Sequence, residues 1–147
     1  MIVGWQEWIS LPELNLPLIK AKIDTGAKTS SLHAYDIKHF TKDGKKYVRF
    51  KVHPIKGSRR TVVECEAPLV DKRHVRSSSG HKQHRPIILA RITLAHASWD
   101  IEINLTNRDY MGFRMLLGRA ALSNMMVDPS NRSLHGRYSK KQVLEHY

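Results

Sequence analysis

The chain has 147 residues, which suits one domain and leaves little room for two. It carries 25 Lys and Arg against 13 Asp and Glu, so its formal net charge at pH 7 is +12. Such a charge favours anionic partners, namely nucleic acid, acidic lipid or an acidic polypeptide. With 41% hydrophobic residues, the chain is too apolar to be a disordered basic tail.

The apolar and cysteine content excludes several further classes of protein. Cys65 is the single cysteine, so neither an intramolecular disulfide nor a Cys-rich metal site can form. The longest apolar runs, near residues 87–90 and 115–117, are far too short to span a membrane. The first residues lack the basic flank of a secretory signal. We therefore expect a cytoplasmic protein that does not associate with membranes.

Short segments rich in β-branched residues alternate with turns along the chain, and two short segments favour a helix, residues 119–122 and 140–146. Many short strands with frequent turns predict a small all-β barrel or sandwich. We expect one domain over residues 1–130 and a basic, poorly ordered C-terminal tail over residues 131–147. The predicted strands are, in chain order, 2–9, 18–23, 32–38, 47–52, 61–65, 87–94 and 99–105.

The stretch from Asp24 to Ala27 is the first in the chain whose residues could form a reactive site. The apolar segment 18–23 delivers a carboxylate, a hydroxyl and a glycine in succession, Asp24, Thr25 and Gly26. Glycine permits a sharp turn and a close backbone approach, and the hydroxyl can hold that turn by a hydrogen bond. The pattern indicates a carboxylate presented at the edge of a sheet. A turn carboxylate with a purely structural role fits the same residues.

A second motif lies near the other end of the chain, where the apolar residues Leu116 and Leu117 run into Gly118, Arg119 and a short helical segment. In this order, the two motifs resemble those of the retropepsin-like aspartic proteases. The wider stretch 106–119 is similar to the bacterial branch of that clan, whose members often carry the label ATP-dependent zinc protease. The resemblance covers most of residues 1–130.

The resemblance implies a closed all-β barrel of the pepsin-like acid protease type, with one short helix after Gly118. It also implies an aspartic endopeptidase that works as a homodimer, because this chain has one Asp-Thr-Gly loop and such a site needs two. Two Asp24 carboxylates at the two-fold axis would share one proton and activate a water molecule. Thr25 would link the two loops, and Asp24, Thr25 and Gly26 are the catalytic candidates.

The resemblance also assigns supporting roles to other residues. Retropepsins close over the substrate with a hairpin flap, and the small residues between the two motifs stand where that flap is expected; an ordinary solvated loop is the alternative. The candidates for substrate binding are Ala27, Lys28, Ser77, Ser78, Ser79 and Gly80. The candidates for structural support of the site are Leu117, Gly118 and Arg119.

One position departs from the viral pattern. Viral retropepsins carry a second aspartate four residues after the catalytic one, and it pairs with the arginine of the second motif. Here Lys28 stands at that position, so Arg119 needs another acceptor, for which Asp109 and Asp128 are candidates. A cation beside the site and the charge of +12 favour an acidic, glutamate-rich peptide as substrate. Relatives in this branch are associated with ATP-grasp ligases that add glutamates to a ribosomal protein. This association also favours a glutamate-rich substrate.

Two other functions remain open. One is a catalytically silent retropepsin-like module that binds a protein partner. The other is a basic domain that binds RNA or the ribosome, for which aromatic residues should alternate with Lys and Arg on one sheet face. Tyr47 and Phe50 would fall on opposite faces of a strand, so this platform is poor and nucleic acid is not favoured.

No metal and no cofactor are expected. The chain has no His-Glu-x-x-His motif, and His81 and His84 lack an obvious third ligand for zinc. It also has no Gly-x-x-x-x-Gly-Lys-Ser/Thr loop for the phosphates of ATP. Cys65 lies in an apolar strand and is interpreted as an inert core residue.

Overall fold

The computed structural model describes the whole chain except residues 77–79, 81 and 108–111, and for residues 75, 76, 82 and 83 it describes only the backbone. The elements in chain order are β1 (Ile2–Gly4), β2 (Gln6–Leu11), the 3-10 helix η1 (Pro12–Leu14), β3 (Leu16–Asp24), β4 (Ser30–His33), β5 (Tyr35–Lys42), β6 (Lys45–Val52), β7 (Val63–Arg76), β8 (Lys82–Leu94), β9 (Ala97–Thr106), β10 (Met115–Gly118), the 3-10 helix η2 (Arg119–Leu122), β11 (Met126–Asp128) and the helix α1 (Lys140–Leu144).

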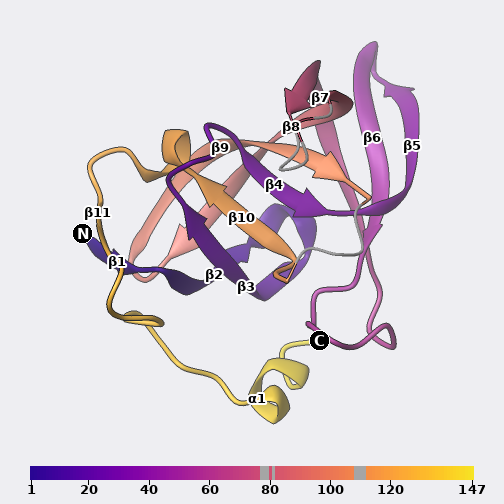
Figure 1. Cartoon of the computed structure of the whole chain (residues 1–147). Helices are drawn as coiled ribbons and strands as arrows, with labels where there is room; N and C mark the ends of the chain where they lie inside the picture. The colour runs from indigo at the N-terminus through magenta and orange to yellow at the C-terminus, as the bar shows by residue number, and fades with distance from the viewer. Residues whose placement is uncertain (77–79, 81, 108–111) are drawn as a thin grey trace.

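Six strands close into a barrel. Their order is β2, β3, β10, β4, β9 and β8, and a pairing of Ser10 in β2 with Thr93 in β8 closes the ring. Beyond β8 the same sheet continues through β7, β6 and β5, which form an arm projecting from the barrel in Figure 1. This architecture confirms the predicted all-β closed barrel with a short helix directly after Gly118, which is the 3-10 helix η2.

Two predicted segments have different limits in the structure. The segment 32–38 is divided at Ala34, where the chain leaves β4 in the barrel and enters β5 in the arm. The basic stretch 71–85, for which the sequence favours an exposed loop or a hairpin tip, is in its described part the end of the hairpin that β7 and β8 form as an antiparallel pair. Ladder hydrogen bonds therefore hold this stretch although its side chains lack the apolar alternation of a half-buried strand.

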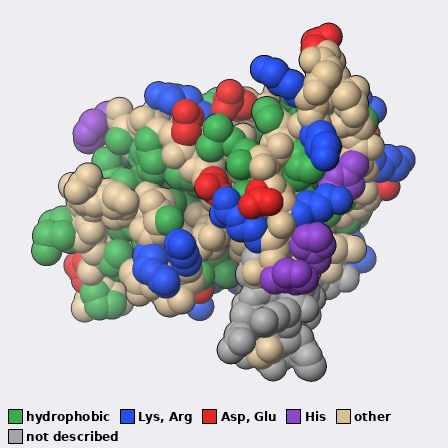
Figure 2. All heavy atoms as spheres, turned by 90° about the horizontal axis from the view of Figure 1, so that it is seen from above, with side chains coloured by type: hydrophobic (Ala, Val, Ile, Leu, Met, Phe, Trp, Pro, Cys, Tyr) green, Lys and Arg blue, Asp and Glu red, His purple; other side chains and the backbone are tan. Residues whose placement is uncertain are grey.

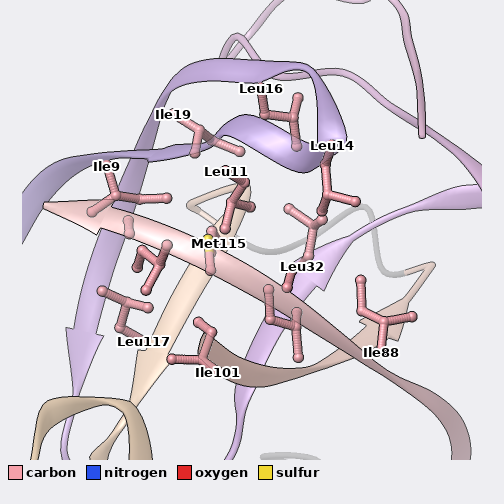
Figure 3. Close-up of a cluster of buried hydrophobic side chains, with 14 of the residues drawn as sticks. Ile9, Leu11, Leu14, Leu16, Ile19, Leu32, Ile88, Ile101, Met115 and Leu117 are labelled. Atoms are coloured by element: carbon pink, nitrogen blue, oxygen red, sulfur yellow. The ribbon is translucent and has the colours of Figure 1, made fainter. Parts of the chain in front are cut away.

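The barrel interior is filled by aliphatic side chains. In β3, residues such as Ile19 and Ala21 face inward and are fully buried, as the alternation of the sequence predicts. Packing of this kind excludes water and is the main source of stability in so small a domain. Figure 3 shows side chains from β2, η1, β3, β4, β8, β9 and β10 pointing toward one another, among them Ile9, Leu11, Leu14, Leu16, Ile19, Leu32, Ile88, Ile101, Met115 and Leu117.

The C-terminal tail packs against the barrel, so the expectation that it is poorly ordered is wrong. The Tyr147 hydroxyl donates a hydrogen bond of 2.6 Å to the carbonyl of Leu18. Val143 in α1 is 3% exposed and packs with Leu18 and Ile55. Figure 1 shows α1 and the C-terminus beside the segment that links β6 and β7. Among the described residues, no helix is long and apolar enough to cross a membrane.

A buried carboxylate joins the tail to the start of the chain. Glu7 is 0% exposed and accepts backbone hydrogen bonds from Gly4 at 2.7 Å, from Leu134 at 3.1 Å and from His135 at 3.2 Å. Hydrogen bonds to a charged acceptor are stronger than those between neutral groups. Glu7 therefore holds the turn between β1 and β2 and the tail in one arrangement.

We expect Glu7→Ala to lower the free energy of unfolding by about 3 kcal/mol, because one buried and two partly buried N–H groups lose their acceptor. Chemical denaturation followed by circular dichroism measures this change. Glu13→Ala is the matched control, because Glu13 is exposed and accepts one backbone hydrogen bond, from Arg91. A loss of stability no larger than that of the control would contradict the role given to Glu7.

Candidate active site

Asp24 is the last residue of β3 and lies beside the second sequence motif. β3 and β10 are parallel neighbours, and their register pairs Leu117 with Ile23 and Gly118 with Asp24. Parallel strands end at the same edge of a sheet, so the Asp-Thr-Gly loop and the Gly-Arg motif emerge together. The structure thus brings together the two motifs that are separated by most of the sequence.

The loop after β3 turns tightly around the Asp24 carboxylate. The Gly26 amide donates a hydrogen bond of 3.0 Å to Asp24 Oδ1, and the Ala27 amide donates one of 3.3 Å to the Asp24 carbonyl. A Cβ atom at Gly26 would lie 3.2 Å from Asp24 Oδ1, which is tight enough to press on the carboxylate. Asp24 is half-buried, whereas Thr25 and Gly26 are exposed. The carboxylate is therefore held in place while the loop stays open to solvent.

The first residues of η2 hold the other side of this loop. The Arg119 amide donates a hydrogen bond of 2.8 Å to the Ala27 carbonyl, and the Ala120 amide donates one of 3.0 Å to the Lys28 carbonyl. The Arg119 guanidinium donates to the Gly26 carbonyl at 3.3 Å. Three donors from one short segment therefore hold the carbonyls of three successive loop residues.

The acceptor of Arg119 is thus a backbone carbonyl of the catalytic-type loop. Asp128 is not its partner, because the Asp128 carboxylate accepts hydrogen bonds from Ser130 and Asn131 in its own turn. Asp109 lies outside the described residues. A carbonyl acceptor explains how Arg119 can support the loop although Lys28 replaces the aspartate of the viral pattern.

Gly118 is required for this close approach. A Cβ atom at Gly118 would lie 2.8 Å from the Lys28 carbonyl oxygen and 2.9 Å from the Ala27 carbonyl oxygen. Both contacts are to backbone that cannot swing away, so any side chain would push the loop outward. The Gly118 amide also donates to the Ser30 hydroxyl at 3.1 Å.

A buried polar network supports the loop from inside the sheet. Asn104 in β9 donates to the Ser30 carbonyl at 2.9 Å, and its side-chain oxygen accepts from the Ser31 hydroxyl and from Arg85, each at 2.9 Å. These four side chains are at most 8% exposed. Sequence reasoning missed all four, although the polar Asn104 among apolar neighbours in a predicted strand was a possible signal.

The substrate-binding candidates are only partly described. Ala27 and Lys28 lie in the loop, and Lys28 is exposed beside a groove of about 530 Å³ that Arg73 and Glu102 also line. Arg73 and Glu102 form an ion pair of 2.7 Å across it. The flap residues Ser77, Ser78 and Ser79 lie outside the described residues, and Gly80 is exposed with a φ of +85°.

The family with the description "Retropepsin-like aspartic endopeptidase RimB" matches residues 2–138. The chain belongs to this RimB-like family. A crystal structure of a protein of unknown function from Legionella pneumophila is similar, with 34% identity and a TM-score of 0.75. The alignment covers 92% of this chain and 98% of that one. The likeness extends over nearly the whole fold.

Curated relatives have a different kind of name. Proteins from Desulfotalea psychrophila, 48% identical, and Shewanella pealeana, 44% identical, are each named "Probable alpha-L-glutamate ligase". The alignments cover 99% of this chain and 32% of each relative, so the chain spans about a third of their length. Neither the family description nor these names carry the zinc-protease label that the resemblance suggested.

In this RimB-like chain, the metal-ligand candidate His84 lies in β8 and the single cysteine, Cys65, lies in β7. Among the described residues, no group of three or more His, Cys, Asp or Glu could hold a metal ion. His84 stacks on His74 of the neighbouring strand with ring centroids 4.9 Å apart, and Figure 2 shows histidine side chains in contact beside Lys and Arg. Cys65 is buried, its thiol donates to the Leu14 carbonyl at 3.2 Å, and burial raises its pKa to about 12. A thiol in this position is not a nucleophile.

Gly118→Ala should destabilise the protein by about 1–3 kcal/mol and displace the Asp24 loop, because the new methyl group would overlap two backbone carbonyls. Thermal unfolding and amide exchange of residues 25–29 measure the two effects. Gly112→Ala is the control, since a Cβ there meets nothing within 4 Å. Equal stability of the two variants would contradict the close approach at Gly118.

Cys65 should resist thiol reagents at pH 8 in the folded protein and react fully after denaturation. Burial keeps the thiol protonated at this pH, because its pKa is about 12. Titration with a chromogenic disulfide, with and without guanidinium chloride, gives the number of accessible thiols. Rapid modification of the native protein would show that this side chain is not buried in solution.

Proposed function

We propose that this chain is an aspartic endopeptidase whose catalytic dyad consists of Asp24 from each of two subunits. The observation that carries the proposal is the Asp24 loop, in which a carboxylate is held by the Gly26 amide while Thr25 and Gly26 remain exposed. The chain contains one Asp-Thr-Gly loop. An isologous dimer supplies the second by placing the same surface of each copy at a two-fold axis.

The chemistry follows from two carboxyl groups about 3 Å apart, which cannot both ionise and therefore share one proton. The ionised Asp24 takes a proton from a water molecule, whose oxygen attacks the scissile carbonyl. The protonated Asp24 polarises that carbonyl and a proton passes to the leaving amine as the C–N bond breaks. The two groups titrate as a unit, so the pH profile of cleavage belongs to the pair.

We propose an extended acidic peptide, rich in glutamate, as the substrate. Lys28 stands exposed at the loop and the whole chain carries a net charge of +12, both of which favour an anionic substrate. The names of the relatives support the same choice, because a ligase of L-glutamate adds acidic residues.

A second candidate is a binding module without peptidase activity. The observation in its favour is that this chain aligns with about a third of proteins named as ligases rather than peptidases. In that case the barrel would hold an acidic chain at the Asp24 loop without hydrolysing it. The two candidates differ in whether the Asp24 carboxylate is needed for a change in the peptide.

Asp24→Asn should lower the rate of hydrolysis of a glutamate-rich peptide by about 10³-fold or more, because an amide cannot serve as the general base. Peptide mass spectrometry measures cleavage, and sedimentation with the peptide present measures dimer formation. Asp43→Asn is the matched control, since Asp43 is an exposed residue of the β5–β6 turn with a φ of +51° that Asn tolerates.

Cleavage lost in Asp24→Asn and kept in Asp43→Asn, with the dimer intact in both, is the expected result. If the wild-type protein binds the peptide without cleaving it, the chain is a binding module. If Asp24→Asn cleaves as fast as the wild type, Asp24 is not the catalytic group.

A further inference from the structure

A cavity of about 210 Å³ lies on the outer face of β2 and β3, away from the Asp24 loop. Trp8 and Lys20 form a cross-strand pair at its floor. The C-terminal tail supplies one wall through Tyr138, whose ring meets that of Trp8 edge-on at 5.6 Å. Phe113 and Lys56 also line this space, which we call the Lys20 cavity.

The Lys20 cavity concentrates positive charge. The Lys20 ammonium lies 5.6 Å from the centre of the Trp8 ring and 5.8 Å from that of Phe113, and the Lys56 ammonium lies 5.2 Å from the same Phe113 ring. Arg114 and Lys140 are further lining residues, and none of the described lining residues is Asp or Glu. Two ammonium groups on one ring without a carboxylate repel each other.

This arrangement disfavours the charged form of Lys20. Its pKa lies below the usual range, chiefly because the side chain is partly desolvated and further because Lys56 and Arg132 are positive. Cation–π contacts with Trp8 and Phe113 offset part of this cost. An anion between Lys20 and Lys56 would remove the remaining repulsion, so the charges favour an anionic ligand.

A second cavity, of about 230 Å³, extends this surface and shares Arg114 with the first. Arg59 and His53 line it, and His53 stacks on Tyr35 with ring centroids 4.7 Å apart. Its described lining also contains no Asp or Glu. The two cavities therefore adjoin at Arg114, and both have cationic and aromatic lining residues.

We propose that these two cavities are a docking site for neighbouring acidic side chains of an extended polypeptide. A glutamate side chain would place its carboxylate between Lys20 and Lys56 and its methylene groups against the edges of the Trp8 and Phe113 rings. The size of each cavity suits a single side chain. Single-stranded nucleic acid is disfavoured, because Lys20 and Lys56 already cover the ring faces on which bases would stack.

This docking site goes beyond the proposed function, because it requires neither the Asp24 carboxylate nor a second subunit. None of its lining residues belongs to the loop 24–29 or to the Gly118 and Arg119 motif. It would retain an acidic chain at a surface separate from the catalytic loop. Binding and cleavage can therefore be measured independently of each other.

The test measures binding of a fluorescent peptide of about eight glutamates by anisotropy, with the full chain carrying Asp24→Asn so that the probe stays intact. Lys20→Glu combined with Lys56→Glu should raise the Kd about tenfold or more, since like charges then meet in the cavity. The binding should also weaken as salt rises, because the contacts are electrostatic. Lys45→Glu combined with Lys46→Glu is the matched control, with the same charge change at exposed positions of the arm.

An equal loss of affinity in the control pair would overturn the proposal, because binding would then follow net charge alone. Tighter binding of an oligouridylate of similar length, weakened by Trp8→Leu, would instead assign the surface to nucleic acid. Lys20→Gln combined with Lys56→Gln serves if the charge-reversed pair fails a thermal-unfolding check, and should still weaken binding severalfold. If the chain with Asp24→Asn and native Lys20 and Lys56 does not bind the peptide, while the chain with Asp24 cleaves it, the docking proposal is overturned and the peptidase proposal stands.

Discussion

The site depends on the parallel pairing of β3 with β10. Directly after β10, the first residues of η2 donate hydrogen bonds to the Asp24 loop. The amides of Arg119 and Ala120 bind the carbonyls of Ala27 and Lys28 at 2.8 and 3.0 Å. Such bonds contribute about 1 kcal/mol each, but leaving their partners unpaired costs more. They form because Gly118 has no side chain to separate the two segments.

This construction places a carboxylate on rigid backbone instead of on a freely moving loop. The barrel supplies the rigidity, since β3 and β10 are packed on the aliphatic core and the network of Ser30, Ser31, Asn104 and Arg85 fills the space beneath the loop with paired polar groups. A positioned carboxylate is what acid–base catalysis requires. A second group of cations, with no Asp or Glu among the described lining residues, lies around Lys20, and it shares no residue with the Asp24 loop, so the proposed cleavage and docking surfaces are distinct.

Several features could be predicted from the sequence, because they depend on neighbours along the chain. Alternation of apolar residues predicted most strands, and the motifs at Asp24 and Gly118 predicted the barrel and the adjoining helix. The predictions were incomplete where the structure depends on contacts between residues far apart in the sequence. The basic stretch 71–85 lacks a strand pattern, yet β7 and β8 pair through it. The helix predicted over residues 140–146 is present as α1, but the contacts of Val143 and Tyr147 that anchor it to the barrel were not predicted.

The sequence by itself determined the all-β class and the turn at Asp24, because alternation and local turn chemistry act over a few residues. The resemblance of its two motifs to known proteins indicated the retropepsin-like family. The tertiary structure alone decided the Gly26 carbonyl as the acceptor of Arg119, the role of Glu7 and the assembly of the Lys20 cavity. The partners in these contacts come from distant parts of the chain. Barrel closure brings them together, and such proximity leaves no periodic signal along the sequence.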